Sequence, residues 1–246
     1  MILFRVILAT GFIHMLPAAM EALTDDSLPA GWKAYDAFAG LFAMLAAMVI
    51  QLIEYIAHQQ YQSMHLNDDD HVGHSHGLAF QNPEAATKIT TYILELGIAM
   101  HSVLIGLALG TATEEFVPLF IALCFHQFFE GMALGAQIAR LKQISVCSAI
   151  IMVLFFAVTT PIGIGIGIGL QSSAYDPESV TSLLVSGILD SLSGGILIYT
   201  ALVSLIATEM GPDATTFHGL STQLKVWYFV AFYAGAGAMA IVGMWA

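Results

Sequence analysis

Long apolar stretches, separated by short polar links, dominate the hydrophobic pattern of this chain. Seven of them reach the roughly 20 mainly apolar residues that a helix needs to cross a bilayer. They fall at about residues 1–22, 36–57, 88–111, 116–139, 145–170, 181–208 and 223–245. Because backbone polar groups in lipid must pair within their own segment, the pattern predicts an all-α polytopic membrane protein, a helical bundle of seven transmembrane helices.

One of these stretches carries a second periodicity. The run TPIGIGIGIGL at residues 160–170 alternates isoleucine and glycine with period two, as a strand would. In a membrane helix the same glycines allow neighbouring backbones to approach closely. We therefore interpret this run as helical.

The composition agrees with a membrane protein. Of the 246 residues 58% are hydrophobic and 10% are charged, against roughly 25% charged in soluble domains. The net charge of −12 argues against a nucleic-acid partner and favours attraction of cations. Cys124 and Cys147 both lie in apolar stretches, so no disulfide framework is predicted. Arg5 interrupts the first stretch and no small-residue cleavage site follows it, which argues against a signal peptide.

The basic residues predict an orientation in the membrane. With seven alternating spans, Lys33 alone falls on one side and the other side carries Arg5, Lys88, Arg140, Lys142 and Lys225. The positive-inside rule places the second side in the cytoplasm. The opposite loops carry the acids Asp25, Asp26, Glu114, Glu115, Asp176 and Glu178, which either gather cations or are solvated loop charges. Glu54 and Glu209 are expected at helix ends, in contact with water.

A polar link at about residues 58–87 lies on the cytoplasmic side in this arrangement. It has no helical period and is predicted to be disordered. His71, His74 and His76 place three imidazoles within six residues, next to the DDD run at 68–70. Short histidine-rich tracts bind metals such as zinc. The alternative is a polar linker whose histidines have no ligand.

Two apolar stretches contain the same ten-residue frame, H-x-x-x-x-G-x-A-L-G. HSVLIGLALG begins at His101 and HQFFEGMALG at His126. The link at 111–116 makes these stretches an antiparallel hairpin, with the two histidines equally far from its turn. About nine or ten helical residues correspond to roughly 14 Å, close to half of a hydrocarbon core of about 30 Å. Both histidines are thus predicted near the bilayer midplane, where transporters bind their substrates.

The second frame adds a carboxylate to this pair. Glu130 follows His126 by four residues and points the same way around a helix, whereas the glycines of each frame face the opposite side. Ionisable groups within a membrane are costly, so such a cluster is predicted to be functional. Nitrogen and carboxylate ligands suit Zn²⁺, Fe²⁺ or Mn²⁺ rather than Cu⁺. The predicted metal-site residues are His101, His126 and Glu130, with Ser102 and Gln127 beside them. A structural polar cluster is the alternative.

Several segments together resemble the ZIP family of zinc- and iron-regulated metal transporters. The resemblance covers nearly the whole chain, and the segments that carry it are the two frames, ATGFIHMLPAA, LELGIAMHSV, TTPIGIGIG, LDSLSGGILIYTALVSLIATE and the histidine-rich link.

This resemblance implies an eight-helix transporter of divalent metals that moves by an elevator-like or rocking motion and forms a homodimer. The metal site is then expected between the family's fourth and fifth helices, at the residues of the two frames. His14, Glu95 and Asp190 match polar positions that either line the pathway or hydrogen-bond between helices. Ile105 stands where some members have a bridging glutamate, so a full two-metal centre is not expected. The chain opens inside the family's second helix, so seven helices are expected here.

The function expected from the sequence is transport of zinc, with iron or manganese as alternatives, into the cytoplasm, with no enzymatic activity. The membrane is expected to be the plasma membrane rather than an internal one. A non-transporting metal sensor or a truncated partner subunit is the main rival. An intramembrane zinc hydrolase is a further one, although the chain has no H-E-x-x-H motif.

Overall fold

The computed structural model describes residues 4–65, 83–112, 116–141, 144–171, 176–211 and 214–242. The described residues are mostly helical and contain no strand. The elements are α1 (Phe4–Ala9), η1 (Thr10–Met15), α2 (Leu16–Leu23), α3 (Ala30–Lys33), α4 (Phe38–His65), α5 (Pro83–Thr111), α6 (Phe116–Ile138), α7 (Val146–Gln171), α8 (Val180–Tyr199), η2 (Thr200–Ile206), α9 (Ala207–Met210), α10 (Thr215–His218) and α11 (Thr222–Val242).

The seven predicted spans are confirmed in kind and in position. Helices long and apolar enough to cross a membrane occupy Val6–Leu23, Phe38–Ile56, Thr87–Thr111, Phe116–Ile138, Val146–Leu170, Val180–Ile206 and Thr222–Ile241. The glycine-isoleucine run lies within α7 and is helical, as interpreted. Large apolar side chains on the outer faces are exposed, as in Val146, Trp227 and Tyr233. Such faces suit the acyl chains of a bilayer.

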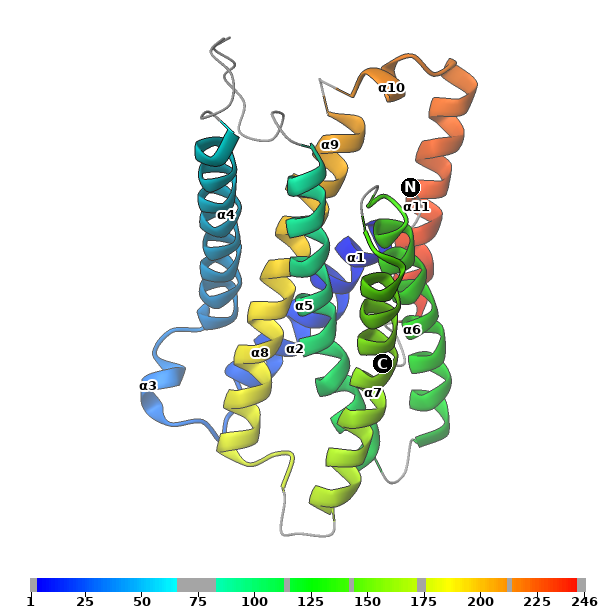
Figure 1. Cartoon of the computed structure of the whole chain (residues 1–246). Coiled ribbons are helices and arrows are strands. Elements are labelled where there is room, and N and C mark those ends of the chain that lie inside the picture. The colour runs from blue at the N-terminus through cyan, green and yellow to red at the C-terminus, as the bar shows by residue number, and fades with distance from the viewer. Residues whose placement is uncertain are drawn as a thin grey trace.

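α5 lies in the middle of the bundle and packs against α4, α6, α7 and α8 (Figure 1). Its contact with α7 is closest where glycines of both helices meet. A Cβ added at Gly106 would lie 2.4 Å from the carbonyl oxygen of Thr160, and one at Gly163 would lie 2.3 Å from that of Val103. The frame glycines of α5 thus pack away from the histidines, as predicted. In α6 the same holds for Gly131, against Phe156, but not for Gly135, which faces open space.

The first span contains a turn of π-helix, η1, between α1 and α2. At its end the Leu16 N–H donates to the carbonyl of Gly11, five residues back. Pro17 follows immediately and has no N–H to offer to the carbonyl of Ile13, four residues before it. A proline inside a helix interrupts the backbone hydrogen bonds between residues four apart, and the wider π-helical turn accommodates this interruption.

The main apolar core lies between the histidines of the two frames and one end of the bundle. In α5 Leu94 and Ile98 precede His101, and in α6 Leu134 and Ile138 follow Glu130. Because α5 and α6 are antiparallel, all four lie toward the same end, with Leu197, Ala201 and Leu205 of the sixth span packed among them. This apolar core lies on the side that the charge pattern assigns to the cytoplasm.

The link between the second and third spans is shorter than predicted. α4 continues to His65 and α5 begins at Pro83, so the expectation of an irregular segment from residue 58 to 87 was wrong at both ends. Helices in membrane proteins extend past the bilayer where water satisfies their side chains, and composition alone does not show where they stop. His71, His74 and His76 lie outside the described residues.

Candidate metal centre

His101, His126 and Glu130 meet inside the bundle. Each offers one ligand atom, and these atoms lie within 4.8 Å of one another. The two Nε2 atoms of His101 and His126 are 3.3 Å apart, and His126 Nε2 lies 3.1 Å from Glu130 Oε1. The side chains are buried, with at most 1% of each residue exposed. The predicted convergence of the two frames is therefore present in the structure.

These distances suit a tetrahedral ion. With metal–ligand bonds of about 2.0–2.1 Å, two ligand atoms of a tetrahedral zinc lie about 3.3 Å apart. Both separations are close to this edge length, and the third, between His101 and Glu130, is at most 4.8 Å. A shared proton between the two imidazoles gives a similar nitrogen–nitrogen distance, and the tautomers decide which nitrogen donates.

The two helices place these side chains for simple reasons. The α5–α6 hairpin brings the heads of the two frames to one level, and the four-residue spacing places Glu130 beside His126 on α6. Gly106 and Gly110 hold α5 tightly against α7, on the opposite face from His101. The face of α5 that packs against α7 therefore fixes the position of the helix, and His101 lies on its opposite face.

Two further polar residues lie beside the histidines. Asp190 on α8 places its Oδ1 3.8 Å from His101 Nδ1, on the side of the ring away from His126. His14 on η1 lies against both imidazoles, with ring centroids 5.3 Å from His101 and 5.4 Å from His126. The resemblance matched these two residues to polar positions that either line the pathway or hydrogen-bond between helices, and the structure places them next to the proposed ligands.

The remaining predicted site residues are less directly connected. Ser102 is fully buried beside His101, and its Oγ has no hydrogen-bond partner among the described residues. The same holds for Oε1 of the partly buried Gln127. Glu95 is buried on α5, six residues before His101, and its Oε1 also lacks a partner in the described part of the chain. Among the histidines, cysteines and acids of the described residues, the converged set is His101, His126 and Glu130, and Glu95 is not part of it.

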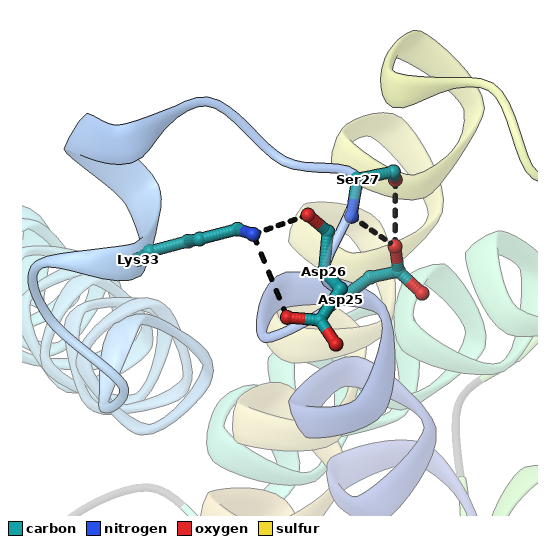
Figure 2. Close-up of polar contacts among 4 residues, drawn as sticks. All are labelled: Asp25, Asp26, Ser27 and Lys33. Carbon is teal, nitrogen blue, oxygen red and sulfur yellow. Dashed lines mark hydrogen bonds and ion pairs between the residues drawn. The ribbon is translucent and has the colours of Figure 1, made fainter.

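Two acids of the loop after α2, Asp25 and Asp26, form local contacts. Figure 2 shows Asp25 accepting hydrogen bonds from the backbone N–H and the hydroxyl of Ser27, and these bonds hold the pKa of Asp25 below its ordinary value. Lys33 pairs with the carboxylate of Asp26 at 3.5 Å and donates to its backbone carbonyl. Asp25 and Asp26 thus have local partners within this loop.

Glu54 is a polar centre that the sequence did not predict. It lies within α4, and its carboxylate accepts hydrogen bonds from Thr90 (3.3 Å), Tyr199 (3.0 Å) and Ser204 (3.0 Å). The expectation that water solvates Glu54 at a helix end was wrong, because three hydroxyls from two other spans replace the water. The sequence does contain hydroxyl side chains in the two spans that face Glu54. No rule based on sequence spacing, however, shows which residues of such distant helices come into contact.

The fold and the cluster define the class of protein: a multi-pass membrane protein with a buried histidine–carboxylate site at the centre of its bundle. Residues 67–243 match the family model described as ZIP Zinc transporter. The chain is 39% identical to Zinc transporter 3 of Arabidopsis thaliana and 37% identical to Zinc transporter 5 of Oryza sativa subsp. japonica. It is 33% identical to Fe(2+) transport protein 3, chloroplastic, of Arabidopsis thaliana.

These similarities extend over the length of the chain. Each alignment covers 98% of it and, in the same order, 71%, 74% and 75% of the relative. No solved structure matches the chain. The chain belongs to the ZIP family of zinc transporters, as its motifs indicated.

Proposed function

We propose that this protein transports divalent metal ions, zinc in preference to iron or manganese, across its membrane into the cytoplasm. The observation that supports this most strongly is the convergence of His101, His126 and Glu130 in the interior of a membrane bundle. Two imidazoles and a carboxylate suit zinc. The relatives named as zinc transporters and the one named for Fe²⁺ agree with this range of metals.

The charge distribution and the packing support the inward direction. The basic residues assign the end near Lys88 and Lys225 to the cytoplasm. The apolar core around Ile98 and Leu134 lies between the ligands and this end. A metal that reaches the ligands from outside is released inward only when this packing separates, so the core acts as the inner gate in our proposal.

The test is uptake of radioactive zinc into metal-starved cells that lack their own uptake systems. Saturable uptake by the natural sequence, lost in His126→Ala and Glu130→Ala, is the expected result. His218→Ala is the matched control, because His218 is exposed on α10, outside the bundle. Protein level and membrane insertion are measured for each variant.

Two outcomes would contradict the proposal. Well-inserted protein that binds zinc without carrying it would be a sensor or an incomplete partner subunit. Uptake that survives both ligand substitutions would place the site elsewhere in the bundle.

We further propose that the protein acts as a homodimer in the plasma membrane. Several exposed apolar faces, including that of α11, can accept a second copy as well as lipid. Cross-linking in intact membranes and fractionation of a tagged protein test these two points separately.

A further inference from the structure

We infer that His14 is a third imidazole ligand of the metal centre and that it favours zinc over manganese. The inference rests on the proposed transport function and deepens it, because it concerns the selectivity of the same site. The three imidazoles of His14, His101 and His126 come from three different segments: η1, α5 and α6.

The rings form a nearly regular triangle. The centroid distances are 5.3 Å from His14 to His101, 5.4 Å from His14 to His126 and 5.3 Å from His101 to His126. Three histidines that share a tetrahedral zinc, with Zn–N bonds of about 2.1 Å, have centroids about 5.2 Å apart. Ordinary ring packing also falls between about 4.5 and 7 Å, so the spacing needs a second observation.

The backbone around His14 supplies that observation. His14 lies in the π-helical turn, a rare conformation that is frequent at functional sites. Phe12 and Ile13 in the same turn are 48% and 45% exposed, whereas His14 turns inward between the two other histidines. No hydrogen bond joins its ring to another residue in the described part of the chain. The His14 ring is partly buried within a membrane span, and a metal ion at the centre would supply a partner for it.

The ring orientations show what binding requires. The His14 ring stands at 81° to that of His101 and at 54° to that of His126. The converged ligand atoms belong to His101, His126 and Glu130, and His14 joins them by rotation about its side-chain bonds. The result is three nitrogens and one oxygen, a four-coordinate set that zinc accepts readily.

A third nitrogen changes the relative affinities of the site. Nitrogen ligands bind zinc more strongly than manganese, which prefers oxygen. A ligand that enters and leaves by rotation also lets the site hold zinc and still release it.

The test compares zinc and manganese uptake by the natural sequence and by His14→Ala. Loss of a metal ligand costs at least about tenfold in affinity, since even the groups that orient ligands contribute that much. We therefore expect the KM for zinc to rise tenfold or more, with little change in the KM for manganese. Phe12→Ala is the matched control, because Phe12 shares the π-helical turn but faces outward. An unchanged zinc KM in folded His14→Ala would overturn the inference.

A second measurement does not depend on transport. His14→Cys is purified in lipid nanodiscs with Cys124 and Cys147 replaced by serine, because both are free thiols. It is loaded with Co²⁺, and its ultraviolet spectrum is compared with that of the same double-serine protein carrying His14. A sulfur-to-cobalt charge-transfer band appears only when residue 14 binds the metal, and its absence from folded protein rejects His14 as a ligand. If the natural sequence transports no zinc into cells but His14→Cys shows the band, the transport proposal is wrong, whereas the assignment of residue 14 as a metal ligand is supported. The same spectrum decides the question if His14→Ala does not fold.

Discussion

Asp190 lies beside His101, on the side of the ring opposite His126. Its Oδ1 is 3.8 Å from His101 Nδ1, which has no hydrogen-bond partner among the described residues. In metal sites a carboxylate commonly accepts from the second nitrogen of a ligating histidine, fixing the tautomer that presents Nε2 to the metal. A small movement that brings Asp190 Oδ1 closer to His101 Nδ1 would form this hydrogen bond. Asp190→Asn is therefore expected to raise the KM for zinc uptake about 10–100-fold.

The control for Asp190 is its neighbour. Ser191 is buried on the same helix, but its hydroxyl donates to the carbonyl of Gly187 within that helix. Ser191→Ala is expected to leave the KM for zinc nearly unchanged. Equal effects of the two substitutions would show that this part of α8 matters for packing and not for the orientation of His101.

At the scale of helices, the contact between α5 and α7 depends on particular glycines. A Cβ at Gly106 would lie 2.4 Å from a backbone oxygen, which no side-chain movement relieves, whereas a Cβ at Gly165 meets nothing within 4 Å. Gly106→Ala should therefore destabilise the protein by about 1–3 kcal/mol or more. Gly165→Ala should be neutral or slightly stabilising, since alanine favours helix. Denaturation in mixed detergent micelles measures both, and similar midpoints would disprove the close contact.

The Glu54 carboxylate connects α4 to α5 and to the sixth span. It accepts from Thr90, Tyr199 and Ser204, so its removal takes one hydrogen bond from each of these hydroxyls. Glu54→Leu is expected to lower the free energy of unfolding by about 1–3 kcal/mol. Glu54→Gln keeps one carbonyl acceptor and should cost less. Unfolding in detergent compares the two, and equal losses would mean that the hydrogen bonds do not hold these helices together.

For the whole molecule, the sequence predicted the elements well and the contacts between distant helices poorly. The spans and the meeting of His101 with His126 follow from length, hydrophobicity and the symmetry of a hairpin, which are local properties. The positions of Asp190 and Glu54 depend on how the sixth span lies against α4 and α5, and no local period determines this. The π-helical turn at His14 was also not predicted. Pro17 signals an irregularity there, but the choice between a kink and a wider turn depends on packing around Gly11, whose added Cβ would meet Ile198 at 2.7 Å.

The orientation of the molecule is a prediction that labelling can test. α3 and α10 lie at opposite ends of the bundle, α3 at the lower end and α10 at the upper end in Figure 1. The excess of lysine and arginine at the α10 end places it in the cytoplasm. With Cys124 and Cys147 replaced by serine, Gly31→Cys on α3 should react with an impermeant maleimide on intact cells. Thr222→Cys, beside α10, should react only after permeabilisation. The reverse labelling pattern would mean that the protein has the opposite orientation in the membrane. The apolar core would then lie between the metal centre and the outside.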